Sequence, residues 1–512
     1  MAGVNAGGGR SAHAKPAHVK APPGTGTRSE QARSEQARSK PAQARPGLLI
    51  RLRTTPGRVR LGVALSTVVA CGLGIAIAMG FGGLNDGFTA IGNHDAQLVE
   101  ESNALYFSAN DMDAQVANVL LTGDDPTLAT DRQQDIASYA QDRQHAEQDL
   151  QQIAVAAAAD PAAQHAVSTV LDALGQYEAL AADAILVNQR GSDPAGRASA
   201  TTLSYFQQAT DLMSSTVLPA ASQLTGANAR SLTASYDQNR SAAGTARLLV
   251  LALGLILIIS LAALQVYLAR RYRRMISPLL AAATVAALAL TAAATVKLTA
   301  QDNHLYVAKV EAFDSILALT QAQAVSYDGN ADESRYLVDP ARAAQYQDSF
   351  LAESQQIAGV GAVGIFQYDA ALAKGIDAYQ ASNATVQFTG FLGAEFRNIT
   401  FPGERAAAER TLLAYQVYQR DDRVLRAMAK TNLDAAISYD IGTSRGQSDW
   451  AFNNYTNALS SVIAINENAF TGAIQDGHST GSGWTGAVPA SAVVVIAALA
   501  IAGTRQRLAE YR

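Results

Sequence analysis

The sequence predicts an all-α membrane protein: four transmembrane helices and two extracytoplasmic up-down helical bundles, arranged as a tandem repeat of span, bundle and span. Three observations predict it. Four long apolar stretches lack ionised side chains, the segments between them follow helical periodicity, and Arg residues gather on one side of the spans. Of the 512 residues, 48% are hydrophobic and only 16% charged, against roughly 25% charged in soluble proteins.

The N-terminal segment 1–47 is predicted to be a disordered basic tail in the cytoplasm. Residues 1–60 hold twelve Lys and Arg but only two acidic residues, and the tail has almost no large apolar side chains. No core can therefore offset the entropy of ordering it. We favour a solvated tail that helps to set orientation over an arm that binds an anionic membrane surface or a cytoplasmic partner.

The four apolar stretches are predicted to cross the membrane. The first three have 21 residues each and the fourth 18, and about 20 helical residues cross a hydrocarbon core. In the first, Val69-Ala70-Cys71-Gly72 resembles a lipoprotein cleavage box, but the apolar run continues beyond Cys71, so we expect Cys71 to lie inside a span. The predicted spans, in chain order, are 61–81, 248–268, 276–296 and 486–503.

Basic residues near the span ends predict the orientation in the cell membrane. They gather before the first span, in the Arg-rich turn 269–275 and in the tail 504–512. Those parts, and with them both termini, are assigned to the cytoplasm. The segments 82–247 and 297–485 then lie on the extracytoplasmic side. Without its cytoplasmic segments, the chain carries 20 basic and 41 acidic residues.

Segment 82–247 is predicted to form a four-helix bundle. Turn-forming residues at 122–126 (TGDDP), at Asp160-Pro161 and at 191–196 (GSDPAG) separate four long helices, the last of which continues into the second span with a kink at Pro219. Long helices with short turns give an up-down bundle. An apolar seam recurs every seven residues along the first helix, at Ile91, Leu98, Leu105, Met112 and Val119.

Segment 297–485 is predicted to repeat this plan. A shift of 208 residues places TGDDP on DGNADE (328–333), which we therefore expect to form a turn, and continues the seam as Tyr306, Phe313, Thr320 and Tyr327. Further breaks are expected at Asp339-Pro340, 359–364 and 440–446.

The insertion 388–405 has no counterpart in the first half of the chain. Its aromatic rings are candidates for docking an extracytoplasmic protein, and the alternative is that they pack inside the bundle. These rings are Phe388, Phe391, Phe396 and Phe401.

The sequence carries no motif of an enzyme. A P-loop, a dinucleotide fingerprint, a zinc-protease motif and a nucleophile elbow are missing, and the seven His are scattered. We therefore expect a non-enzymatic protein and assign no catalytic, cofactor-binding or metal residue. The spans contain no ionisable residue for a transport path, which argues against a carrier. Acidic residues near the first turn could ligate calcium, but we expect a solvated bundle tip: Asp111, Asp113, Asp124, Asp125 and Asp131.

Reception and transmission of a signal remain, because helices that run from a bundle into the bilayer can pass small shifts across it. The run RRYRRMISPLL (270–280) resembles the linker that follows the second span of chemoreceptors and sensor kinases, although here Pro278 opens another span. Output is therefore expected to pass to a separate cytoplasmic protein. The candidate contact residues are Arg270, Arg271, Arg273 and Arg274.

The outer segments resemble the four-helix-bundle sensor modules of bacterial chemoreceptors. In topology, residues 50–512 resemble the membrane component of the actinobacterial amino-acid-sensing pathway. That resemblance implies a transducer between a glutamine/glutamate-type solute-binding lipoprotein outside and the Ser/Thr protein kinase G inside, without nucleic acid; a homodimer stays open. An acidic surface would repel a free acidic amino acid, and Arg132, Arg143, Arg335 and Arg405, which could bind one directly, are scattered. The alternatives are a direct receptor for a small extracellular ligand and an envelope scaffold.

Overall fold

The computed structural model describes residues 55–157, 161–272, 277–382 and 385–509. These residues are almost entirely helical, and within them a single bridge between Gly359 and Thr389 is the one extended pairing. The α-helices are α2 (Thr55–Ala90), α3 (Ala96–Thr122), α4 (Ala129–Ala156), α5 (Pro161–Gly191), α6 (Ala200–Leu212), α7 (Leu218–Tyr272), α8 (Pro278–Tyr306), α9 (Asp314–Val338), α10 (Ala343–Ile357), α11 (Ile365–Ala381), α12 (Gly390–Asn398), α13 (Glu404–Ala429), α14 (Leu433–Asp440), α15 (Ser448–Gly481) and α16 (Ala487–Ala509).

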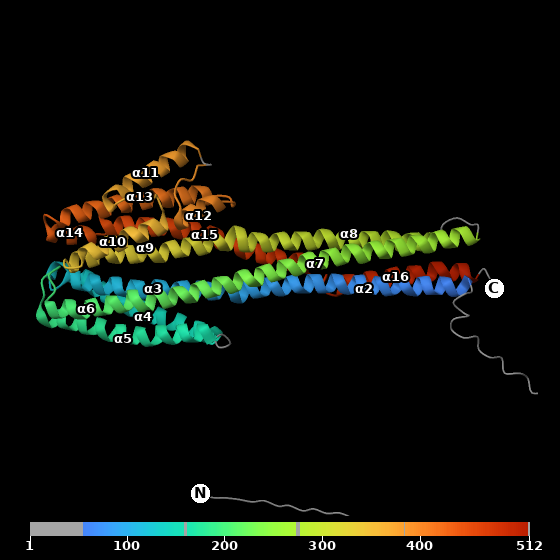
Figure 1. Ribbon diagram of the computed structural model, residues 1–512, viewed down its shortest axis with the longest axis horizontal. Helices are drawn as coiled ribbons and strands as arrows, with labels where there is room; N and C mark the ends of the chain where they lie inside the picture. Colours follow the sequence, from blue (N-terminus) through green and yellow to red (C-terminus); the bar gives the residue numbers. More distant parts are fainter. Residues whose placement is uncertain (1–54, 158–160, 273–276, 383–384, 510–512) are drawn as a thin grey trace, which may run out of the picture. The chain divides into compact units, whose positions relative to one another are not determined.

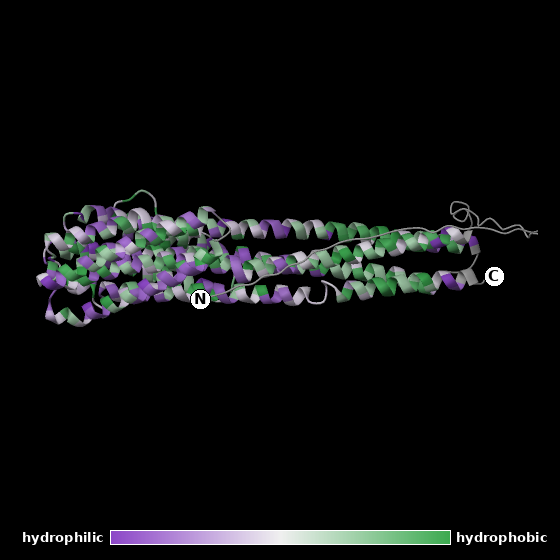
Figure 2. Cartoon of the chain, turned by 90° about the horizontal axis from the view of Figure 1, so that it is seen from below, coloured by the Kyte–Doolittle hydropathy of each residue, from purple (hydrophilic) through white to green (hydrophobic). Residues whose placement is uncertain are grey.

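Four helical runs are long and apolar enough to cross a membrane, which confirms the predicted fold class of an all-α, multi-pass membrane protein. Three of them extend far beyond a bilayer: 66 residues for Gly57–Thr122, 72 for Ala200–Arg271 and 61 for Pro278–Val338. The fourth, Ala487–Gln506, has 20. Figure 2 shows hydrophobic residues concentrated at one end of these runs and hydrophilic residues over the bundles at the other.

Each of the three long runs contains a π-helical segment. These segments are Ile91–Asp95 between α2 and α3, Met213–Val217 between α6 and α7, and Val307–Phe313 between α8 and α9. The second lies directly before Pro219, where the sequence predicts a kink, because proline cannot donate the next helical hydrogen bond. All three runs thus pass from span to bundle without a break, but with a local irregularity.

The apolar ends of α2, α7, α8 and α16 pack side by side (Figure 1). Small residues permit close approach, as is usual between membrane helices. Ser66 and Ser260 place their hydroxyl oxygens 3.0 Å apart between α2 and α7. Gly254 of α7 packs so closely on Thr291 of α8 that a Cβ there would clash with the threonine side chain. The approach of Gly254 to Thr291 joins the two halves of the chain within the span layer.

Two helical bundles follow the span layer. The first bundle consists of α3, α4, α5, α6 and the start of α7; the second consists of α9 to α15 (Figure 1). The expected breaks after Thr122 and after Gly191 are present, as are those at Asp339, at 359–364 and after Asp440. The break expected at Asp160-Pro161 falls on residues 158–160, which lie outside the described residues. The seam of the first helix is buried, apart from Leu98, which is half-buried.

The predicted turn at DGNADE is wrong. Residues 328–333 lie inside α9, which continues to Val338 and ends where Asp339 precedes Pro340. Asp332 and Glu333 are buried there, and Asp328 and Asp332 are paired with Arg335. Ion pairs of Arg335 within α9, and one to Asp113 on α3, accompany a helix whose local sequence favours a turn. Tyr306, predicted to belong to the seam, is exposed, while its neighbour Leu305 is buried.

The two halves of the chain correspond with a shift of 216 residues rather than the predicted 208. Their π segments begin at residues 91 and 307, and the helices that follow end at residues 122 and 338. Helices α3 and α9 pack against each other. Hydrogen bonds between them join residues with a similar offset, as in Asn103 to Thr320 and Ser334 to Asn118. Helices α3 and α9 therefore run parallel and in register.

Candidate functional site

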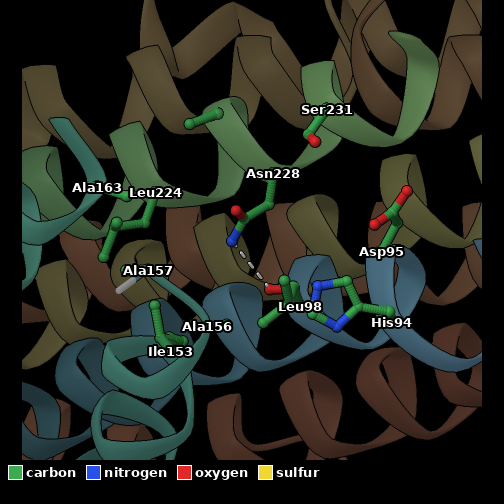
Figure 3. A pocket seen from close by; sticks show the side chains of 11 residues that line it. His94, Asp95, Leu98, Ile153, Ala156, Ala157, Ala163, Leu224, Asn228 and Ser231 are labelled. Atoms are coloured by element: carbon green, nitrogen blue, oxygen red, sulfur yellow. Dashed lines mark hydrogen bonds between the residues drawn. The ribbon is translucent and has the colours of Figure 1, made fainter. Parts of the chain in front are cut away.

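A cavity of about 160 Å³ lies in the first bundle, beside the π segment Ile91–Asp95 (Figure 3). Four helices enclose it. The C-terminal end of α4 and the first residues of α5 cover one side, and α3 and α7 form the other. Its lining residues are His94, Asp95, Leu98, Ile153, Ala156, Ala157, Ala163, Leu224, Ala227, Asn228 and Ser231.

The polar groups of this cavity come from the π segment and from α7. The amide of Asn228 donates a hydrogen bond to the carbonyl of Leu98, at 3.3 Å (Figure 3). It donates a second one to the hydroxyl of Ser102, at 2.8 Å. The Oδ2 atom of Asp95 is buried without a hydrogen-bond partner. No Lys or Arg is among the lining residues. An apolar pocket with a few convergent polar groups is the usual form of a small-molecule site.

A more open hollow of about 540 Å³ borders the same π segment, between α3 and α15. Glu100 and Glu467 line it together with Gly92 and Phe470. Burial raises the pKa of Glu100, and the neighbouring carboxylate of Glu467 raises it further. The surroundings of the π segment are therefore acidic.

In the second bundle, the corresponding π segment Val307–Phe313 is covered by the chain itself. Asn398, the last residue of α12, donates hydrogen bonds to the carbonyls of Val310 and Glu311 and to the hydroxyl of Ser315, at 2.9, 3.1 and 3.0 Å. In each bundle, an Asn amide therefore donates to a backbone carbonyl and to the hydroxyl of the serine four residues later. The pair is Leu98 and Ser102 in the first bundle, and Glu311 and Ser315 in the second. Only in the second bundle does the Asn come from the insertion.

A second polar site lies between the bundles, around the buried Arg335. Its Nη2 lies 2.8 Å from Asp113 on α3, and its Nη1 lies 2.8 Å from Asp328 and 2.7 Å from Asp332, both on α9. Glu353 of α10 is buried beside them. We call these five residues the interbundle cluster. Four carboxyl groups share one guanidinium, and so many buried charges of one sign favour protonation of some of them.

The pKa values in this cluster follow from burial. Burial raises the pKa of Asp113, and the positive charge of Arg335 offsets part of this effect. Burial raises the pKa of Asp332 to about 7 and that of Glu353 well above its usual range, with nearby carboxylates adding to the latter shift. The pKa of Asp449 on α15 is raised to about 7 by burial and by Asp111 and Asp131 of the first bundle.

Asp113, predicted to lie on a solvated bundle tip, is instead completely buried between the bundles. Each Arg considered as a direct ligand for an acidic amino acid has a partner within the protein. Arg335 pairs with the aspartates of the interbundle cluster, and Arg405 donates to the Tyr379 hydroxyl. Arg143 pairs with Glu147, and Arg132 donates to the Gly123 carbonyl. They do not converge on one site.

The four aromatic rings of the insertion lie mainly within the protein. Phe388 and Phe396 are buried in the core of the second bundle, with ring centroids 5.2 Å apart. Phe391 is half-buried against the same core, and Phe401 against the core that continues into the span layer. In this arrangement Phe388 and Phe396 pack the bundle and are not exposed for docking.

Of the candidate output residues, Arg270 and Arg271 are exposed at the end of α7. Arg273 and Arg274 lie outside the described residues. Within the part of the chain that the structure describes, no group of three or more His, Cys, Asp or Glu is arranged to hold a metal ion.

The comparison with known protein families concerns the first bundle. Residues 87–237 match the family model of an actinobacterial sensor domain. This part of the chain is similar to a sensor domain. Together with the four apolar helical runs, the match supports a membrane sensor, and it suggests a non-enzymatic role. No curated protein and no solved structure matches the chain.

All residues that line the cavity fall between 87 and 237, inside the matched sensor domain. Sequence reasoning missed them because the site combines residues of four helices. The signals available in the sequence were weak: polar residues at 94 and 95 within an apolar pattern, and Asn398 inside an insertion.

Proposed function

We propose that this protein is a transmembrane sensor whose first bundle receives an extracytoplasmic signal and whose long helices carry it to the cytoplasmic side. The observation that carries this proposal is the helical continuity of the runs Gly57–Thr122, Ala200–Arg271 and Pro278–Val338 from the spans into the bundles. Packed helices move as rigid rods, so a shift of one turn in the bundle displaces the span. The match of residues 87–237 to a sensor domain supports the same role.

The π segments support transmission, because π-helical turns are frequent at functional sites and can change register locally. The cavity borders one of them, Ile91–Asp95. A change in this segment would shift α2 relative to α7 within the span layer. There, Ser66 and Ser260 lie in direct contact.

A disulfide between these two positions tests the proposal. In full-length protein with Cys71→Ser, Ser66→Cys and Ser260→Cys, we expect the rate of disulfide formation in cells to change when free amino acids are removed from the medium. Two glycines inserted after Asp95 serve as the control, because a flexible joint should abolish the change. An unaltered rate under every nutrient shift would falsify rigid transmission through these helices.

Orientation is part of the proposal, and the Arg residues near the span ends support it. Reporter fusions after residues 150, 273 and 400 test it. We expect extracytoplasmic activity at 150 and 400 and cytoplasmic activity at 273. A cytoplasmic signal at 150 or 400 contradicts the assignment of the bundles to the outside.

The second candidate is a relay from an amino-acid-binding lipoprotein to a cytoplasmic Ser/Thr kinase. One observation favours it: no Lys or Arg lines the cavity, so an acidic amino acid would find no partner for its carboxylates there. Capture by a separate binding protein avoids this problem. The exposed Arg270 and Arg271 would then contact the kinase. Copurification of a lipoprotein and a kinase in mild detergent supports the relay, and recovery of neither contradicts it.

A further inference from the structure

We propose that the cavity in the first bundle binds a small primary amine with a short aliphatic body, through the carboxylate of Asp95. The proposal deepens the sensor function proposed above, since it names the chemical class of ligand that the matched domain would receive. It rests on the lining of the cavity, on the unpartnered oxygen of Asp95 and on the contrast with the second bundle.

Asp95 lines the cavity and carries an acidic side chain whose hydrogen-bonding capacity the protein leaves partly unused. Its Oδ2 atom is buried and has no donor within the protein. Buried polar atoms nearly always have a hydrogen-bond partner, so the carboxylate of Asp95 can accept a donor from a bound molecule. A carboxylate accepts its strongest hydrogen bonds from a charged donor, and an ammonium group is such a donor.

The charges of the residues around the cavity also support a cationic ligand. Asp95 and His94 are the titratable groups of the lining, and the nearby hollow between α3 and α15 adds Glu100 and Glu467. No Lys or Arg among these lining residues competes for the carboxylate. The local field therefore favours a cation and disfavours an anion.

The size and shape of the cavity also support a small ligand with an aliphatic body. Seven of the eleven lining residues are Ala, Leu or Ile, and they surround about 160 Å³. A cavity of about 150 Å³ holds a molecule the size of benzene. Four or five carbon atoms beside one ammonium group would therefore fill the space, with the aliphatic part against Ile153, Leu224 and their alanine neighbours.

In the second bundle, the protein supplies its own hydrogen-bond donor at the corresponding π segment. There the amide of Asn398 covers the π segment and satisfies the carbonyls of Val310 and Glu311. The insertion that provides Asn398 has no counterpart in the first half. The first bundle thus keeps open, beside its π segment, a space that the second bundle fills with an internal hydrogen-bond donor.

The experiment compares three probes that share a four-carbon skeleton: n-butylammonium, n-butanol and n-butyrate. Binding to the full-length protein in nanodiscs is measured by ligand-detected NMR and by the shift in unfolding temperature. We expect butylammonium to bind at least tenfold more tightly than butanol, because charge-assisted hydrogen bonds are substantially stronger than neutral ones. Butyrate should bind most weakly.

Variants assign this selectivity to the cavity. Asp95→Asn preserves the shape of the side chain, and the variant should bind butylammonium and butanol about equally tightly. Asp172→Asn changes an exposed carboxyl on α5 of the same bundle and should leave the preference intact. Ala227→Phe fills the cavity and should abolish binding of all three probes while the unfolding temperature remains close to that of the parent protein.

Equal binding of butylammonium and butanol to the parent protein overturns the proposal, as does a preference that persists in Asp95→Asn. Failure of all three probes to bind overturns it as well, since the cavity then holds only water. None of these results affects the disulfide test of helix transmission. The two proposals therefore fail independently.

Discussion

The two bundles follow the same helical plan, but each treats the start of its long helix differently. In the first bundle, the π segment Ile91–Asp95 borders a cavity. In the second, the segment Val307–Phe313 is capped by Asn398 from an insertion that the first bundle lacks. The comparison shows that the first bundle keeps a cavity beside its π segment, whereas the second bundle covers the corresponding segment with its own chain.

The bundles also depend on each other. Arg335 of the second bundle is the counter-charge of Asp113 in the first, and α3 packs directly on α9. A change in one bundle therefore acts on the other through a buried contact. Substitutions at the interface and at the π segments can break this dependence or the difference between the bundles.

The Arg335→Met substitution should destabilise both bundles together. It leaves Asp113, Asp328 and Asp332 buried without their counter-charge, which costs about 3–5 kcal/mol. Thermal unfolding of the full chain in nanodiscs measures the loss. Arg342→Met is the matched control, because the ion pair of Arg342 with Asp211 also joins the bundles but is largely exposed, and its loss should cost about 1 kcal/mol or less. Two separate transitions, of which only one shifts, would show that the bundles unfold independently.

Phe388→Ala distinguishes packing from docking in the insertion. Phe388 is fully buried, so its truncation should destabilise the second bundle by about 3–5 kcal/mol. The half-buried Phe391 provides the comparison, and Phe391→Ala should cost markedly less. Unfolding temperature and recovery of associated proteins are measured for both variants. If Phe388→Ala folds normally but loses an associated protein, the insertion is a docking surface after all.

Asn398→Ala should cost about 1–3 kcal/mol, because it removes a donor shared by two carbonyls and a hydroxyl. The equivalent change in the first bundle, Asn228→Ala, should cost less, because water in the adjacent cavity can replace the lost donor. Chemical unfolding of both variants measures the difference. Equal losses of unfolding free energy would contradict the proposed difference between the π segment beside a cavity and the one covered by Asn398.

Stability should fall as the pH rises from about 4 to about 8. The folded-state pKa values of Asp332 and Asp449 are raised to about 7, above those of the unfolded chain. The folded protein therefore binds more protons in this range, and the stability present below pH 4 is lost as the pH passes through 7.

Asp449→Asn should flatten this dependence by up to about 4 kcal/mol, since the pKa of Asp449 is raised from 3.8 to about 7 and each pKa unit corresponds to about 1.4 kcal/mol. Asp172→Asn, on the exposed face of α5, should not change it. Unfolding temperatures measured between pH 4 and pH 8 test both expectations. A stability that rises with pH in the parent protein contradicts the assignment of raised pKa values.

The spans and several helix ends could be predicted from the sequence alone. An uncharged apolar run of 21 residues has few alternatives to a membrane helix. The ends at Thr122 and Asp339 also follow from local chemistry, since glycine and the residue before proline disfavour further helix. These features depend on neighbours in the chain, which a sequence displays directly.

The positions of the buried charges and of the cavity follow from packing between helices. DGNADE has the composition of a turn, yet it is helical: Arg335 pairs with Asp328 and Asp332 on the same helix, and with Asp113 across the interface between the bundles. The cavity takes its lining from four helices, and the cap on Val310 comes from Asn398, 88 residues away. The free energy of a buried charge or an unfilled space depends on atoms brought together by packing. Separation along the chain carries little information about such contacts.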